Sequence, residues 1–279
     1  MDHEEYRRIS FETWQRVAGG WDRHREYMWQ ATEKVGEWLI HALDPEPGDK
    51  VLELAAGLGE TGLTLARVLG DDGHLILSDF SPNMIDAARR RGAELGVRNV
   101  EYRVMDAERM DLEDGSVDDV LCRFGYMLMP DPAAAFRETG RVLRDGGRVA
   151  FSVWSTPDRN PWAAVPGRLL IEMGHMPPPE LDAPGIFSMS ERARIEELVE
   201  GAGLELKKVH AIDVEWRFAT FEDVWGFLNE VAGGISLQIE RLSEEDREAV
   251  KGALQERLAP FERDGAYRVP GESLNVLAY

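Results

Sequence analysis

A glycine-rich turn is the stretch of this sequence with the most definite chemical content. Its glycines are Gly57, Gly59 and Gly62, and an apolar stretch runs into it. Glycine has no Cβ and tolerates positive φ, so the backbone N–H groups of such a turn can approach a nucleotide-like ligand closely. The spacing spells the G-x-G-x-x-G pattern of dinucleotide binding, which taken alone indicates a nicotinamide enzyme.

Carboxylates around the turn distinguish between possible ligands. Glu53 lies inside the apolar stretch before Gly57, where a nicotinamide-binding strand is normally wholly apolar. A carboxylate there suits a ligand with an ammonium group near the turn, such as the methionine end of S-adenosylmethionine (SAM). Asp79 can accept hydrogen bonds from the ribose of either ligand, and Asp106 with the small Ala107 offers a place for an adenine. Because a dinucleotide leaves Glu53 unexplained, the carboxylates favour SAM.

Alternating strand and helix patterns place these residues. The alternation is typical of a parallel sheet with helices on both faces. Two predicted helices begin with an N-cap residue followed by proline, at Ser81-Pro82 and Asp131-Pro132. We expect five strands within residues 50–154, separated by helices, at 50–55, 74–78, 100–104, 117–123 and 148–154.

Five segments are expected along the chain. Residues 1–48 are an N-terminal helical cover, and 49–154 form the ligand-binding core. Residues 155–219 are a substrate-side segment that ends in a sixth strand, 220–272 a helical insertion, and 273–279 a final strand. The insertion carries two amphipathic helices, of which the first begins with the capping pair Thr220 and Asp223.

Composition narrows the classes of partner. The net charge is −20, from 52 acidic and 32 basic residues, which disfavours nucleic acids and anionic membranes. Cys122 is the one cysteine, so neither an intrachain disulfide nor a cysteine zinc cluster is expected. The six histidines lack paired ligand spacing, so no metal is expected. No long apolar run occurs, which predicts a cytoplasmic protein without a membrane span. No pattern specifies an oligomeric state.

Residues 50–154 resemble class I SAM-dependent methyltransferases, the large group that includes the ubiquinone and menaquinone C-methylases. The resemblance rests on a series of strings in order: VLELAAGLG at 51–59, SDFSPNM at 78–84, DAE at 106–108 with DGSVD at 114–118, RFG at 123–125 and RVLRDGG at 141–147. An ordered series over about a hundred residues is much more specific than one glycine turn.

The resemblance implies a set of cofactor contacts. Gly59 also fits a role in helix–strand packing, and Met84 a position in the core. The resemblance implies that the methionine end is bordered by Glu53, Ala55 and Gly57, with Gly59 as a further cofactor residue of the same turn. It implies that Asp79 holds the ribose, and that the adenine lies against Phe80, Met84, Asp106 and Ala107. Arg123 would close the site. The resemblance also implies a sixth strand at 204–212 and an antiparallel seventh at 274–279. The fold is then a doubly wound, seven-stranded, mostly parallel α/β sheet, with the insertion as a lid over the strand carboxyl ends.

The methyl acceptor is less clearly indicated. Quinone C-methylases typically have Leu-Arg-Asn-Val after Phe-Gly, whereas this chain has YMLM at 126–129, which argues against a quinone. Candidate general bases are His175, followed by His24 and Glu215. Methionine and aromatic residues predict a pocket for an apolar or aromatic small molecule, with an O-, N- or C-acceptor left open: Tyr27, Tyr126, Met127, Trp154, Trp162, Met173, Met176 and Phe187.

Two other functions stay open on the sequence. A NAD(P)-dependent Rossmann oxidoreductase would keep the glycine turn but leave Glu53 without a role. A non-catalytic SAM-binding protein would keep the whole cofactor site. Binding of NAD without SAM would favour the oxidoreductase over the methyltransferase. Binding of SAM without formation of the demethylated product would favour the non-catalytic protein.

Overall fold

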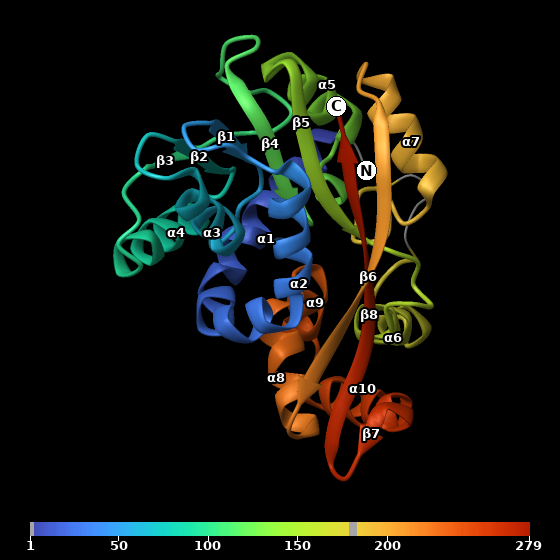
Figure 1. The fold of residues 1–279 in the computed structure, drawn as a ribbon. Helices are drawn as coiled ribbons and strands as arrows, with labels where there is room; N and C mark the ends of the chain where they lie inside the picture. The colour runs from blue at the N-terminus through green and yellow to red at the C-terminus, as the bar shows by residue number, and fades with distance from the viewer. Residues whose placement is uncertain (1–2, 179–182) are drawn as a thin grey trace.

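The computed structural model describes residues 3–178 and 183–279. Ten α-helices and eight strands are assigned in these ranges (Figure 1). The helices are α1 (His3–Arg23), α2 (Arg25–Leu43), α3 (Glu60–Leu69), α4 (Pro82–Glu94), α5 (Pro132–Val142), α6 (Pro161–Glu172), α7 (Arg192–Gly201), α8 (Phe221–Val231), α9 (Gly234–Arg241) and α10 (Glu244–Leu258). The strands are β1 (Lys50–Glu53), β2 (His74–Asp79), β3 (Val100–Val104), β4 (Val117–Arg123), β5 (Leu143–Trp154), β6 (Leu206–Phe218), β7 (Glu262–Arg263) and β8 (Ala266–Ala278).

One mixed sheet organises the chain. Its strand order is β3-β2-β1-β4-β5-β8-β6, and the short β7 pairs with β8. The pairs among the first five strands are parallel, and β8 runs antiparallel to both β5 and β6. The predicted doubly wound, mostly parallel sheet is therefore confirmed. The two-residue β7 is an addition that the sequence pattern did not predict.

Helices pack against the sheet because their apolar stripes must be buried. Helix α2 crosses β4, β5, β8 and β6, while α3 and α4 lie on β2 and β3. Helix α5 packs on β5 and α7 on β6. The predicted caps form: Ser81 and Asp131 accept hydrogen bonds from the backbone at the starts of α4 and α5, each with proline at the first turn. Thr220 and Asp223 complete the predicted capping box of α8.

The strands β6 and β8 extend beyond the end of β5. The last residue of β5, Trp154, pairs with Ser273, which also pairs with Ile212 of β6. From there β6 continues to Phe218, paired with Tyr267, as a two-stranded arm. Helices α6, α8 and α10 pack around this arm (Figure 1). The final strand is therefore much longer than the expected 273–279, and β5 likewise begins five residues before the expected position 148.

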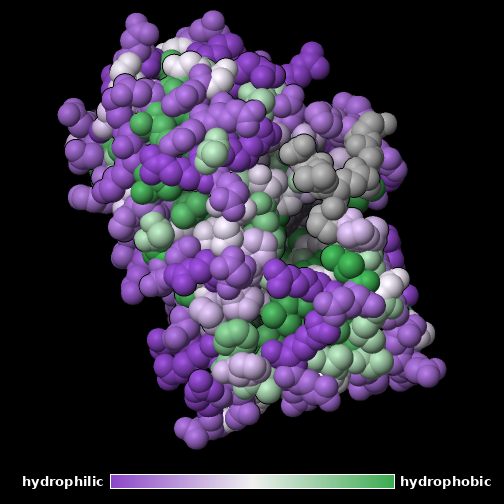
Figure 2. Space-filling model, turned by 90° about the vertical axis from the view of Figure 1, so that its right-hand side faces the viewer, coloured by the Kyte–Doolittle hydropathy of each residue, from purple (hydrophilic) through white to green (hydrophobic). Residues whose placement is uncertain are grey.

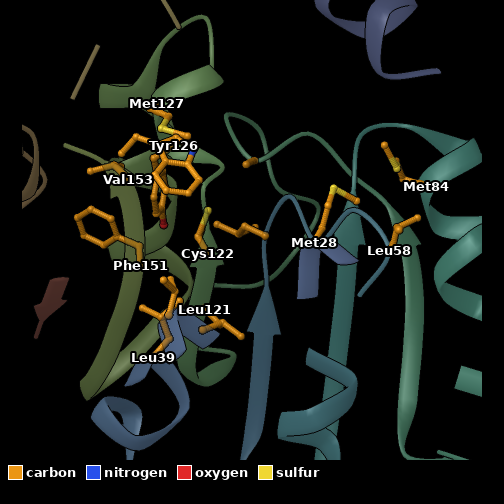
Figure 3. Packing of buried hydrophobic residues seen from close by; sticks show 14 of the residues in the cluster. Met28, Leu39, Leu58, Met84, Leu121, Cys122, Tyr126, Met127, Phe151 and Val153 are labelled. Atoms are coloured by element: carbon orange, nitrogen blue, oxygen red, sulfur yellow. The ribbon is translucent and has the colours of Figure 1, made fainter. Parts of the chain in front are cut away.

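The apolar core lies between the sheet and its helices. Figure 3 shows Leu39, Leu121, Tyr126 and Phe151 packed together beside Cys122. The Cys122 thiol is fully buried, and burial raises its pKa to about 12, which agrees with a structural thiol. Within the described residues, no helix combines the length and apolar character needed to cross a membrane.

Candidate cofactor and acceptor site

The glycine turn links β1 to α3, and its glycines have different roles. Gly57 and Gly59 both have positive φ, at 56° and 79°. A Cβ on Gly59 would lie 2.7 Å from Leu77 Cδ1, so this position needs glycine for packing as well. A Cβ on Gly57 would meet only the Trp21 ring, at 4.0 Å. Gly57 is therefore the glycine whose backbone faces open space that a ligand can use.

Glu53 ends β1 and is 2% exposed. Its Oε1 accepts a hydrogen bond from the Gly62 backbone N–H at 3.1 Å, while Oε2 is buried without a hydrogen-bond partner. Burial raises the pKa of this carboxyl to about 8, although the nearby Arg123 guanidinium opposes the shift. An unpaired buried carboxyl oxygen of this kind fits a site for a cationic ligand.

Asp79 ends β2 and ties it to the glycine turn. Its Oδ2 accepts a hydrogen bond from the Gly57 N–H at 2.9 Å, and Oδ1 accepts one from the Ser81 N–H at 2.9 Å. Burial raises its pKa to about 6, and these backbone donors limit the shift. The carboxylate is thus held at the strand end, where a ribose can be hydrogen-bonded.

Helix α1 contacts the loops after β2 and β3 around this site. Arg7 Nη1 donates to Asp106 Oδ2 at 2.5 Å and Arg7 Nη2 to Glu108 Oε2 at 2.6 Å. Phe11 lies edge-to-face with Phe80, with ring centroids 5.9 Å apart. One turn after Phe11, the helix places Gln15 at the start of α4. These contacts were missed by the sequence analysis, where the spacing of residues 7, 11 and 15 was the available signal.

Gln15 Oε1 accepts hydrogen bonds from Ser81 Oγ at 2.6 Å and from the Asn83 N–H at 3.0 Å. Further along α1, Trp21 Nε1 donates to the Val231 carbonyl of α8 at 2.9 Å. At Gly20 a Cβ would lie 2.1 Å from the Glu230 carbonyl oxygen, so α1 and α8 approach each other closely. Helix α1 therefore joins the loops of the cofactor site to α8.

Two strained backbone positions lie at the ends of β1 and β4. Ala55 and Phe124 are non-glycine residues with φ of 48° and 61°. A Cβ on Gly125 would be 2.6 Å from Ala55 Cβ, so the two strand ends are packed closely. Arg123 Nη1 donates to Thr32 Oγ1 at 2.7 Å, and its guanidinium lies 5.8 Å from the rings of Trp29 and Phe124. Burial lowers the Arg123 pKa, which the Glu53 carboxyl opposes. Strain of this kind is concentrated at functional sites.

Two predicted cofactor residues are largely enclosed by protein. Met84 is buried in the core together with Leu58 (Figure 3). Ala107 is also buried, beside the Asp106 carboxylate that pairs with α1. For Met84 this arrangement matches the packing alternative.

Three of the eight predicted acceptor residues come together in one aromatic cluster. Trp154 stacks on Phe124 with centroids 4.2 Å apart and planes at 7°, and its ring lies 5.0 Å from Trp162. Trp162 lies 4.9 Å from Trp216, which the sequence analysis missed. The predicted Tyr27 has ring contacts with Trp216, Phe218 and Phe227. The full cluster consists of Phe124, Trp154, Trp162, Trp216, Phe218, Phe227 and Tyr27.

The other predicted acceptor residues are not among the members of this cluster. Tyr126 is 0% exposed, stacks on Phe136 and shares a hydrogen bond with Thr139 Oγ1 at 2.6 Å, which places it in the core. Met127 is buried, and its carbonyl accepts hydrogen bonds from Gly185 N–H and Ser188 Oγ. Three more predicted residues lie after β5 and are partly buried against the core: Met173, Met176 and Phe187.

The candidate bases are dispersed. His24 Nε2 lies 3.2 Å from Glu230 Oε2, with its ring edge-to-face to Phe227. Glu215 pairs with Arg217 on an exposed stretch of β6. His175 follows α6, where its backbone N–H bonds to the Leu170 carbonyl. Across residues 3–178 and 183–279, no group of three or more histidine, cysteine, aspartate or glutamate side chains could hold a metal ion.

Comparisons with known proteins agree with this geometry. The family described as a methyltransferase domain matches residues 51–147. A ubiquinone/menaquinone biosynthesis C-methyltransferase of Vibrio campbellii is 28% identical, over 71% of this chain and 81% of that protein. The aklanonic acid methyltransferase of a Streptomyces strain is 32% identical over 42% of this chain and 54% of its own.

A solved structure has a similar fold. The crystal structure of a putative methyltransferase from Bacillus halodurans matches with a TM-score of 0.61 at 20% identity, covering 87% of this chain and 97% of that one. This level of identity supports the fold alone. With Glu53, Asp79 and the glycine turn arranged as described, the cofactor is SAM, and the sequence matches and the fold together support a class I SAM-dependent methyltransferase.

Proposed function

We propose that the chain transfers a methyl group from SAM to an apolar or aromatic small molecule bound at the aromatic cluster. The observation that carries this proposal is the continuity of the cluster. It begins with Phe124 at the carboxyl end of β4, beside Arg123 and Glu53, and continues through Trp154 into the β6–β8 arm. In open α/β sheets the ligand crevice lies outside the strand carboxyl ends.

The residues present fit SAM. Glu53 Oε2 is buried and unpaired, which suits the ammonium group of the methionine end, and Gly57 leaves backbone space beside it. Asp79 accepts hydrogen bonds at the strand end where the ribose would lie. Asp106 is the proposed partner of the adenine amino group, and Arg123 closes the methionine end. SAM supplies a sulfonium-bound methyl group that an aligned nucleophile can accept.

The chain then needs to orient the acceptor and exclude water. Helix α1 packs over the cofactor loops through Arg7, Phe11 and Gln15, and the same helix contacts α8. On the face drawn in Figure 2, hydrophobic residues border a hollow near the middle of the molecule. Because α1 bonds to α8 and α8 packs on α9, we propose that these three helices together form the cover of the cofactor site, and that the predicted helical insertion supplies the acceptor side of that cover.

The need for a general base depends on the acceptor atom. His175 stays the first candidate where the acceptor must lose a proton, and His24 beside Phe227 the second. Substitution of each by alanine separates them, because removal of a base lowers kcat at neutral pH and leaves SAM affinity unchanged. If both variants keep the kcat of the wild type, the acceptor is attacked without help from either histidine.

Calorimetry and product analysis test the proposal. The protein should bind SAM and not NAD, and a panel of apolar and aromatic acceptors should yield S-adenosylhomocysteine with at least one of them. Binding of NAD without SAM would contradict the proposal. Tight SAM binding without product across the panel would favour the non-catalytic alternative.

A further inference from the structure

Two polar atoms inside the aromatic cluster have no hydrogen-bond partner. Trp216 is 4% exposed, and its Nε1 is buried and unpaired. Tyr27 Oη is likewise buried and unpaired, and the two rings lie 6.0 Å apart. The backbone N–H of Arg217 approaches the Tyr27 hydroxyl without completing a hydrogen bond. Buried polar groups in native proteins are normally paired, so two in one cluster need an explanation.

The side chains around the cavity beside Trp216 offer its Nε1 no partner. A cavity of about 10 Å³ lies against Trp216, and apolar side chains line it, including Trp162, Phe227 and Leu258. This volume is at the lower bound for one ordered water, which would itself need polar neighbours. The closed cluster therefore leaves both groups unsatisfied, at a cost in free energy that a bound molecule can remove.

The two atoms define what that molecule must carry. An indole N–H can only donate, so the ligand must present an oxygen or another acceptor atom to Trp216. A tyrosine hydroxyl both donates and accepts, so the same oxygen can bond to Tyr27 as a hydroxyl or as a carbonyl. The surrounding rings favour a flat apolar body. The cavity is lined by no charged residue, so an ionised acceptor would be poorly stabilised there.

We infer that the methyl acceptor is a neutral ring compound with a hydroxyl or carbonyl oxygen, and that Trp216 and Tyr27 determine this specificity by bonding to that oxygen. The inference rests on the proposed function, because it assumes that the acceptor binds in the cluster. Since the cavity is far smaller than any ring, the acceptor must displace contacts between rings. Helix α8, which supplies Phe227, has to move away from the β6–β8 arm for this.

Substitutions that remove one polar atom and keep a ring test the inference. Trp216→Phe removes the N–H, and Tyr27→Phe removes the hydroxyl. Trp38→Phe is the matched control, because the Trp38 ring stacks on His210 outside the cluster. Calorimetry on protein saturated with S-adenosylhomocysteine measures affinity for two probes of similar shape, 2-naphthol and 2-methylnaphthalene.

The wild type and Trp38→Phe should bind 2-naphthol about tenfold more tightly than 2-methylnaphthalene, the combined effect of two hydrogen bonds to buried groups. Trp216→Phe and Tyr27→Phe should each lose the part of this preference that one bond supplies, about threefold, and keep their affinity for 2-methylnaphthalene. Absence of binding by both probes, or the full preference retained in both variants, would overturn the inference. SAM binding is measured on the same samples, and its absence in the wild type would instead overturn the proposed function.

Discussion

The Gly62 backbone N–H donates a hydrogen bond to Glu53 Oε1, and the place of a Cβ on residue 62 is only 2.0 Å from Glu53 Oε2. The third glycine of the turn thus makes room for a carboxyl group on the neighbouring strand. The dinucleotide-like glycine spacing therefore has a different physical basis in this chain, because residue 62 must be glycine to leave space for the Glu53 carboxyl group.

Gly62→Ala should displace the Glu53 carboxyl and lower stability by about 1–3 kcal/mol, as expected for overpacking. SAM affinity should fall by at least tenfold, since the carboxyl moves away from the methionine end. Gly252→Ala is the control, because Gly252 lies in α10 with open space around its Cβ position. Alanine at this position should raise the free energy of unfolding by about 0.5–1 kcal/mol. Denaturant unfolding and calorimetry give both quantities. Unchanged SAM affinity in Gly62→Ala would contradict the role of Glu53.

The raised pKa of Glu53 predicts a dependence of stability on pH. In the unfolded chain the carboxyl ionises near its ordinary value of 4.5, whereas in the folded protein it holds its proton up to about pH 8. The folded state thus binds more protons in this window, and stability falls as pH rises. Between pH 6.5 and 8 the loss from this group should be about 1.5 kcal/mol. Glu53→Gln should remove this slope, and urea unfolding at several pH values measures it.

The same pKa predicts proton release when SAM binds. At pH 7 the Glu53 carboxyl is largely protonated without ligand, and the ammonium group of SAM would favour its ionised form. Close to one proton should leave for each SAM bound, which calorimetry detects in buffers that differ in ionisation enthalpy. Asp79, with a pKa of about 6, is already mostly ionised and contributes little. A binding enthalpy independent of buffer would show that Glu53 does not face the ligand's charge.

Asp79 provides a test at the expected ribose end of the site. Asparagine at this position keeps one acceptor oxygen and places an NH₂ group against either Gly57 N–H or Ser81 N–H. Asp79→Asn should weaken SAM binding by tenfold or more, about 1.4 kcal/mol, through loss of the carboxylate's hydrogen bonds. Asp86→Asn on α4 is the control, because that carboxylate is exposed and pairs only with Arg89. Equal SAM affinity in the two variants would remove the assignment of Asp79.

The sequence was sufficient for the sheet and for the acidic strand ends. Strand periodicity, glycine spacing and proline caps are local signals, and they placed Asp79 at the end of the second strand and Glu53 inside the first, of which it is the last residue in the structure. The extent of the β6–β8 arm was not predictable, because it depends on a register that pairs Trp216 with Val269 across the sheet. Trp216 was therefore missed, because it lies beyond the expected sixth strand at 204–212.

Composition also misled the acceptor prediction at one position. Tyr126 follows β4 in a stretch of methionine and aromatic residues, which was interpreted as a ligand wall. Its hydroxyl finds Thr139 Oγ1 on α5, and its ring packs on Phe136, so the residue is satisfied within the core. Such a partner on another element is invisible in local sequence patterns. The same reason hides the pairing of Arg7 with Asp106, which lie 99 positions apart.

That pairing supplies a final prediction about exchange of the cofactor. Arg7 bonds at once to Asp106 and to the largely buried Glu108, and so fastens α1 over the loop after β3. Arg7→Ala should therefore speed dissociation of S-adenosylhomocysteine several-fold, since a partly exposed ion pair contributes about 0.2–1 kcal/mol. Added salt should speed dissociation from the wild type in the same direction.

Arg8→Ala is the matched control for Arg7→Ala. Arg8 lies next to Arg7 on α1 but pairs only with Glu12, one turn along the same exposed face. Chase of bound S-adenosylhomocysteine with excess SAM should give the wild-type rate in this variant. If Arg8→Ala and Arg7→Ala dissociate at the same rate, helix α1 does not retain the cofactor through its contact with Asp106. A faster rate in Arg7→Ala alone would mean that opening of α1 limits release, because neither arginine carries out the chemical step.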